Sequence, residues 1–73
     1  MGNQQGIRRK SVMRENYNGY ELSTAWDDEA LGFGFSVHDK KGVEVSKSID
    51  PYFYEENALT AARAAADALP AQE

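Results

Sequence analysis

Apolar and polar side chains alternate along two neighbouring stretches of this sequence. The first stretch has an apolar or β-branched residue at every second position: Tyr20, Leu22, Thr24 and Trp26. The second repeats the pattern with Phe33, Phe35 and Val37. Because successive side chains of a strand point to opposite faces of a sheet, the alternation predicts two half-buried strands that share one apolar face. Phe33 and Phe35 are therefore expected to face the interior.

The run Gly32-Phe33-Gly34-Phe35 is also similar to the signature strand of the RNA-recognition motif. In that motif the aromatic rings contact RNA, so the alternate positions of the strand must fill the core. Here the alternate positions are glycines followed by Ser36 and His38, which are unable to fill a core. The sequence therefore favours a structural role for the two phenylalanines.

A turn and a third strand follow. The sequence Asp39-Lys40-Lys41-Gly42 predicts a tight hairpin with a type I turn, in which the glycine supplies the left-handed residue. The next strand is expected to cover residues 43 to 49. Three residues are assigned to its apolar face: Val43, Val45 and Ile49.

The rest of the chain predicts one helix. Asp50-Pro51 is expected to start it, because proline is tolerated at the first helical position, and Pro70 is expected to end it. Four residues fall on the helix face that should pack on the sheet: Leu59, Ala62, Ala66 and Leu69. The sequence therefore supplies a helical cover for the apolar face of the strands.

The first 16 residues differ from the remainder in charge. They carry four basic residues (Arg8, Arg9, Lys10 and Arg14) against Glu15, a net charge of +3, whereas residues 17–73 carry four basic and eleven acidic groups, a net charge of −7. The segment has few apolar side chains and no periodic pattern, which is typical of disordered chain. Residues 1–16 are thus interpreted as a flexible basic tail, residues 17–70 as the domain and residues 71–73 as a C-terminal tail.

Together these elements predict a single α+β domain: a three-stranded antiparallel β-meander with one C-terminal α-helix packed on one face (β-β-β-α). Two motifs within it, Tyr-x-Gly-Tyr-Glu-Leu at residues 17–22 and Glu-Glu-x-Ala-Leu at residues 55–59, resemble small bacterial β-β-β-α domains of unknown function. The resemblance implies the fold and a bacterial origin, and it implies no catalytic residue.

The side chains needed for catalysis or metal binding are scarce. The chain has no cysteine, which excludes thiolate metal sites and cysteine nucleophiles. Its one histidine, His38, is expected on the solvated side of a strand end, and Asp27-Asp28-Glu29 fits a solvated turn better than a calcium loop. We therefore expect no catalytic residue, metal, cofactor or small-molecule substrate.

No stretch approaches the ~20 apolar residues of a membrane span, and the first residues lack the apolar run of a signal peptide. A cytoplasmic protein without membrane contact is the resulting expectation.

Consecutive aromatic residues provide the main candidate for a binding site. Tyr52, Phe53 and Tyr54 cannot all point inward, because successive side chains diverge by 100° or more in a helix or a strand. Together with Ala61 and Ala65 on a small-residue helix face, they are predicted to bind a protein partner or a second copy of the chain. The alternative is nucleic-acid binding through the basic tail, with four candidate residues: Arg8, Arg9, Lys10 and Arg14.

Overall fold

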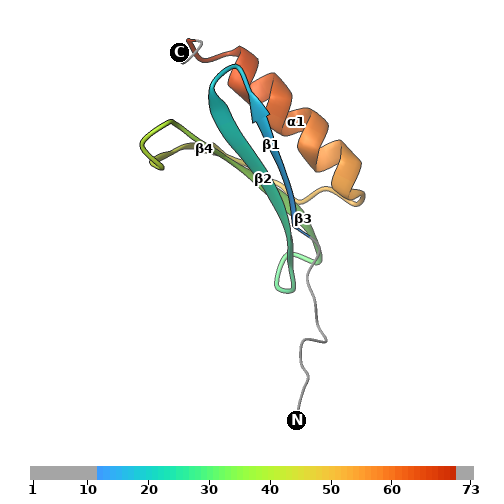
Figure 1. Cartoon of the computed structure of the whole chain (residues 1–73). Helices are drawn as coiled ribbons and strands as arrows, with labels where there is room; N and C mark the ends of the chain where they lie inside the picture. The colour runs from blue at the N-terminus through green and yellow to red at the C-terminus, as the bar shows by residue number, and fades with distance from the viewer. Residues whose placement is uncertain (1–11, 71–73) are drawn as a thin grey trace.

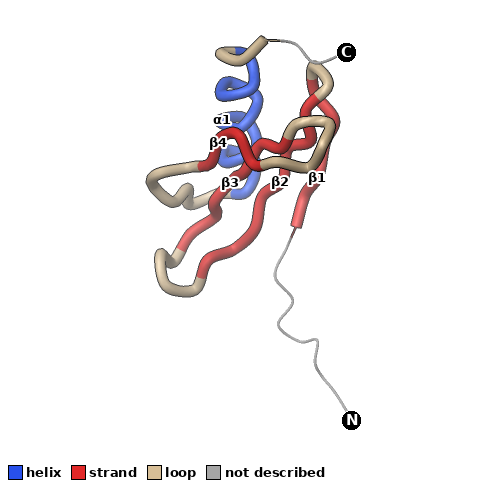
Figure 2. The backbone as a smooth tube through the Cα atoms, turned by 90° about the vertical axis from the view of Figure 1, so that its left-hand side faces the viewer, coloured by secondary structure: helices blue, strands red, loops and turns tan. Residues whose placement is uncertain are grey.

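The computed structural model describes residues 12–70, which form one antiparallel sheet with a helix across one of its faces (Figures 1 and 2). The strands are β1 (Val12–Tyr17), β2 (Tyr20–Asp27), β3 (Gly32–His38) and β4 (Glu44–Lys47), and the helix is α1 (Glu55–Asp67). The strands lie side by side in chain order. The α+β class and the C-terminal helix are confirmed, whereas the predicted number of three strands is wrong because the described part of the chain has four.

The additional strand is β1, and a two-residue turn joins it to β2. Asn18 and Gly19 have φ angles of 56° and 84°, and positive φ at both central residues is what the favoured hairpin turn requires. Residues 12–16 were assigned to the tail but pair with β2, so that Arg14 lies opposite Ser23. Residues 1–11 and 71–73, the rest of the two predicted tails, lie outside the described residues.

Polar side chains fasten β1 to the helix. The Arg63 guanidinium donates two hydrogen bonds to the Glu15 carboxylate, at 2.7 and 2.6 Å. One turn further along α1, Asp67 accepts a hydrogen bond from the Tyr17 hydroxyl at 2.9 Å. An arrangement with two N–H donors on one carboxylate is the geometry that fixes direction as well as distance.

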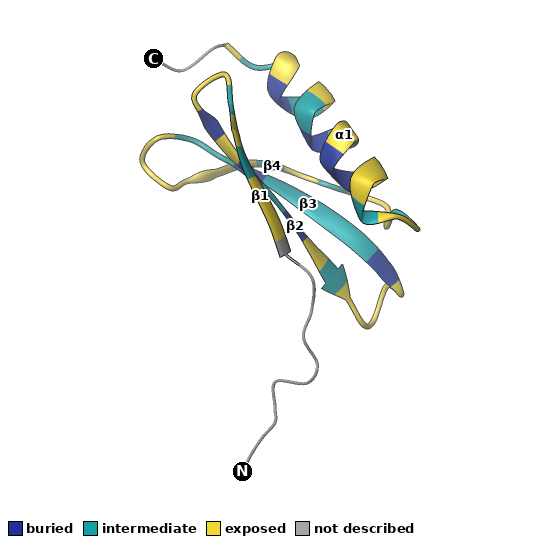
Figure 3. Ribbon diagram, turned by 45° about the vertical axis from the view of Figure 1, so that its right-hand side comes forward, coloured by how far each residue is buried: buried dark blue, intermediate teal, exposed yellow. Residues whose placement is uncertain are grey.

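The core lies between α1 and the middle strands, and Figure 3 shows the buried side of the helix turned toward the sheet. Its buried members come from β2, β3 and α1: Tyr20, Leu22, Val37, Leu59, Ala62 and Ala66. Phe35 and Leu69 pack against this cluster from its margin. The helix face predicted to cover the sheet is therefore confirmed.

The two phenylalanines of β3 have different neighbours. Phe35 packs against the core, as predicted. Phe33 stacks edge-on against Trp26, with ring centroids 5.1 Å apart, and is half-buried. Neither ring of this pair belongs to the core cluster, and both side chains are half-buried.

The hairpin between β3 and β4 has the predicted turn, but the side chains that follow the turn do not lie on the predicted faces of the sheet. The Asp39 carboxylate accepts hydrogen bonds from the backbone N–H groups of Lys41 and Val43, and Gly42 has a φ of 86°. A register shift next to Val37 then places Ser46 opposite that valine. Because one extra residue exchanges the two faces of a strand, Val43 and Val45 are exposed, and their assignment to the apolar face was wrong.

The predicted helix start at Asp50-Pro51 is also wrong. Tyr52 forms an isolated bridge with Phe33, through two backbone hydrogen bonds of 2.7 and 2.8 Å. Residues 49–51 therefore form an irregular edge segment beside β3, where proline is tolerated because its missing N–H faces no partner strand. The side chain of Ile49, predicted on the apolar face, is 96% exposed.

Candidate functional site

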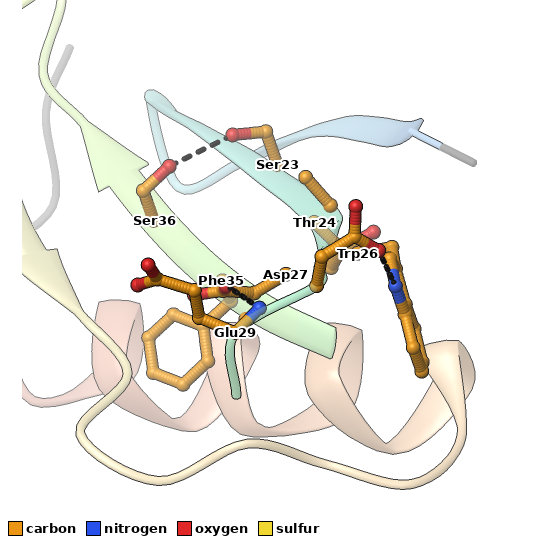
Figure 4. A pocket seen from close by; sticks show the side chains of 10 residues that line it. Ser23, Thr24, Trp26, Asp27, Glu29, Phe35 and Ser36 are labelled. Atoms are coloured by element: carbon orange, nitrogen blue, oxygen red, sulfur yellow. Dashed lines mark hydrogen bonds between the residues drawn. The ribbon is translucent and has the colours of Figure 1, made fainter. Parts of the chain in front are cut away.

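The face of the sheet that points away from α1, here called the open face, carries a shallow groove. Small residues form its floor, since they alternate along β2 and β3 with the core residues: Ser23, Ala25, Gly34 and Ser36. The Ser23 and Ser36 hydroxyls are 2.9 Å apart and hydrogen-bonded to each other (Figure 4). The groove measures about 420 Å³, and Trp26 and Phe35 are also among the residues that line it.

Three carboxylates stand at one end of this groove, on the last residue of β2 and the first two residues of the turn that follows it. They are Asp27, Asp28 and Glu29, here called the acidic turn. The Asp27 carboxylate accepts hydrogen bonds from the backbone N–H groups of Glu29 and Ala30, at 2.9 and 3.3 Å. The Trp26 indole N–H donates to Asp28 at 2.6 Å. The turn is thus ordered by its own acidic side chains.

A row of polar residues crosses the open face. Strand register aligns Arg14 with Ser23, Ser23 with Ser36, and Ser36 with Lys47. This is where the structure places Arg14, one of the residues predicted to bind nucleic acid. The other three, Arg8, Arg9 and Lys10, lie outside the described residues.

The three consecutive aromatic residues divide between the interior and the surface. Tyr52 is half-buried, and its ring lies 6.3 Å from that of Phe35. Phe53 and Tyr54 are 77% and 62% exposed, and their rings stack edge-on at 4.8 Å. We call these two residues the aromatic pair. It lies immediately before the first residue of α1.

The two alanines predicted to extend this patch lie elsewhere. Ala61 and Ala65 are both half-buried, and Ala65 packs against the core. Ala58, one turn nearer to the aromatic pair, is completely buried. The structure therefore does not join the alanines and the aromatic pair into one exposed surface.

The sole histidine lies at the end of β3. His38 is half-buried and is aligned with Glu21 of β2 and Glu44 of β4. Within residues 12–70 no group of three or more histidine, cysteine, aspartate or glutamate side chains is placed to hold a metal ion.

Two carboxylates owe altered pKa values to their hydrogen bonds. The Arg63 guanidinium lowers the pKa of Glu15 from its ordinary value through hydrogen bonding. The backbone N–H of Val43 does the same for Asp39. Both carboxylates support the fold, since one ties β1 to α1 and the other orders a turn.

No protein-family model, no curated protein and no solved structure matches the chain. In the part of the chain that the structure describes, no helix is long and apolar enough to cross a membrane.

Proposed function

We propose that this chain is a non-enzymatic, cytoplasmic protein-interaction module and that the aromatic pair is the centre of its binding surface. The observation that carries the proposal is the exposure of Phe53 and Tyr54, which present two rings in edge-on contact to solvent. Aromatic residues are enriched at the energetic centres of protein interfaces, because they contribute a large contact area and have few rotamers to lose.

The position of the pair adds to this argument. Tyr52 fastens the segment to β3 by two backbone hydrogen bonds, and α1 begins directly after Tyr54. The rings therefore project from backbone that is anchored on both sides. A surface anchored in this way loses less conformational entropy when a partner binds.

A second copy of the chain is the partner to test first. Sedimentation of the full chain should give a mass that is a multiple of 8.1 kDa, and Tyr54→Glu should lower it. The Tyr54 side chain makes no helix-capping hydrogen bond, so the substitution removes no bond of that kind. Val43→Glu, which places the same charge on a different exposed residue, is the matched control and should leave the mass unchanged. A chain that stays monomeric at high concentration would contradict self-association.

A different protein partner requires a different experiment. A photo-crosslinking amino acid at position 53 should form a discrete adduct in cells, because that side chain is exposed and central to the proposed surface. The same amino acid at position 31, where Leu31 is 72% exposed, is the control for non-specific crosslinking at an exposed apolar position. Equal products from both positions would count against a binding surface at the aromatic pair.

Nucleic-acid binding is the second candidate, and the placement of Arg14 and Lys47 in one row of the open face favours it. Retention on DNA or RNA should then fall steeply with salt and should be lost when Arg8, Arg9 and Lys10 are replaced by glutamine. Unchanged retention after that replacement would remove this candidate.

A further inference from the structure

The turn between β1 and β2 presents an asparagine followed by a glycine to solvent. Asn18 and Gly19 are the two central residues of this turn, and both are exposed. The turn lies at the same end of the molecule as the last turn of α1 (Figure 1), where Asn18 is hydrogen-bonded to Asp67. A chemical change at Asn18 therefore takes place in contact with water and acts directly on the helix.

An asparagine in this position can lose its side-chain amide without an enzyme. The backbone nitrogen of the following residue attacks Cγ of the asparagine, and the new N–Cγ bond forms as the Cγ–Nδ2 bond breaks. The Nδ2 group leaves as ammonia and takes with it the proton of the attacking N–H. Water then opens the resulting succinimide ring at either of its carbonyl groups, which gives aspartate or isoaspartate. Water is the only co-reactant.

Three local features favour this reaction at Asn18. The attacking nitrogen belongs to Gly19, which has no β-carbon to hinder its approach. The hydrogen bonds that close the turn join Tyr17 and Tyr20, so the Gly19 N–H takes no part in them. The Asn18 amide donates to Asp67 at 3.3 Å, which is longer than an ordinary N–H···O hydrogen bond and restrains the side chain only weakly.

The other two asparagines within residues 12–70 lack these features. Asn16 is followed by Tyr17 inside β1, and Asn57 is followed by Ala58 inside α1. Both successors carry a side chain, and the Ala58 N–H donates to the Tyr54 carbonyl oxygen at 3.2 Å. These two positions are therefore internal references for the reaction at Asn18.

The product changes the contact between the hairpin and the helix. Asp67 accepts hydrogen bonds from the Tyr17 hydroxyl at 2.9 Å and from the Asn18 amide at 3.3 Å. Aspartate at position 18 loses the amide donor and places a second negative charge beside Asp67. Isoaspartate also leads the backbone through its β-carbon, which adds one atom to a turn whose register allows two residues.

We propose that Asn18 is a site of spontaneous deamidation and that the reaction weakens the attachment of the β1–β2 hairpin to α1. Because ammonia is lost, the change does not reverse. The new repulsion is exposed to solvent and is screened by salt, so it loosens the contact and does not unfold the domain.

Peptide mass spectrometry tests the reaction in the full chain, which is kept folded in buffer while the exchange of amide nitrogen for oxygen is followed at each asparagine. Asn18 should be converted while Asn16 and Asn57 stay intact, and an isoaspartyl methyltransferase should label the isoaspartate product. Asn18→Gln is the matched control and should stay unmodified, because its longer side chain would have to close a larger ring. Conversion of Asn18 no faster than that of Asn57 would overturn the proposal.

The structural consequence is tested with Asn18→Asp, which introduces the aspartate product directly. Its thermal midpoint should lie below that of the native chain at low salt, and the difference should shrink as salt is added. In an Asp67→Asn background the same substitution should lower the midpoint much less, because the neighbouring charge is gone. An equal decrease in both backgrounds, or none in the native background, would contradict a weakened contact with Asp67.

Discussion

Leu31 combines two features that are unusual in one residue. Its φ angle is 57°, and its side chain is 72% exposed. The left-handed conformation brings a β-carbon too close to the following carbonyl oxygen and costs a non-glycine residue roughly 1–2 kcal/mol. The backbone N–H of Leu31 donates to the Asp27 carbonyl oxygen at 2.8 Å, so the closure of the turn fixes this conformation.

Leu31→Gly should therefore stabilise the protein. We expect the free energy of unfolding to rise by about 1 kcal/mol at most, because relief of the φ strain is partly offset by the greater freedom of glycine in the unfolded chain. Urea denaturation measures the change. Ala30→Gly is the control, since Ala30 is not at positive φ and should lose stability. A gain in both variants would mean that the turn is not strained at Leu31.

Two glycines of β3 allow a paired test of close packing. A β-carbon added at Gly32 would lie 2.6 Å from the Pro51 β-carbon, whereas one at Gly34 would lie 3.1 Å from the Ser48 hydroxyl. We expect Gly32→Ala to cost about 1–3 kcal/mol, because the segment that carries Pro51 must move. Gly34→Ala should cost less, since a serine side chain can rotate away. Equal thermal midpoints of the two variants would contradict this packing.

At the scale of the elements, β1 depends on side chains that lie almost fifty residues away. Glu15 and Tyr17 are hydrogen-bonded to Arg63 and Asp67, respectively, and both bonds lie on the side of α1 that faces β1. These contacts explain why a strand with few apolar residues pairs with the sheet. They also make its attachment sensitive to pH.

The Glu15 carboxylate should produce an acid-dependent loss of stability. Its pKa in the folded state lies below the ordinary value of 4.5, because it accepts hydrogen bonds from Arg63. The stabilisation is therefore fully present above about pH 4.5 and is lost as the pH falls through the lower, folded-state pKa. Thermal midpoints of the native chain and Glu15→Gln should differ at pH 7 and converge as the pH falls below the folded-state pKa of Glu15. A constant difference across this range would show that the ion pair contributes nothing.

Truncation separates β1 from the chain that precedes it. Removal of residues 1–16 deletes five residues of β1 and the Glu15–Arg63 pair, so we expect loss of the cooperative thermal transition. Removal of residues 1–11 keeps all of β1 and should preserve the transition. Circular dichroism during heating distinguishes the two outcomes. Similar transitions for both truncations would mean that β1 is dispensable.

The alternation of β2 and β3 and the apolar stripe of α1 were sufficient to predict the packed layers. The first strand, β1, was missed because the side chains that attach it to the helix, Arg63 and Asp67, are distant in sequence. Asn18-Gly19 between two tyrosines was nevertheless a local hairpin signal. The prediction of which β4 side chains face the core was wrong. A single bulge residue reverses the facing of the strand, and an alternating sequence pattern does not reveal such a residue.

The candidate site was predictable in part. Three aromatic residues in succession required at least one to be exposed, and Phe53 and Tyr54 are. That Tyr52 points inward depends on its backbone bridge to Phe33, which sequence periodicity does not reveal. The small residues of the open face follow from Gly34 and Ser36 of β3 and Ser23 of β2, whereas its acidic end depends on how the β2–β3 turn closes.

For the molecule as a whole, few large side chains are completely buried. Leu22, Val37 and Thr24 are the largest ones within residues 12–70, and alanines supply much of the helix contribution to the core. Domains of this size have a small free energy of unfolding. Each large core residue therefore contributes a substantial share of that free energy.

Leu22→Ala should consequently unfold a large fraction of the protein. Truncation of a fully buried leucine costs about 2–5 kcal/mol, comparable to the whole stability expected of a small domain. The near-ultraviolet circular dichroism of the core tyrosine should decrease at 25 °C. Val45→Ala, which shortens a partly exposed side chain, is the control and should change stability by less than about 1 kcal/mol. Equal effects would contradict the position of the core.

The order of the strands in the sheet also governs how the chain reaches this structure. Each strand pairs with its immediate neighbour in sequence, and the turn between β1 and β2 has only two residues. Such a topology has low contact order, because each pairing closes a short loop before the next one forms. We expect rapid folding that begins in the hairpins and is completed by α1, so that unpaired strand edges, the usual starting point of aggregation, are exposed only briefly.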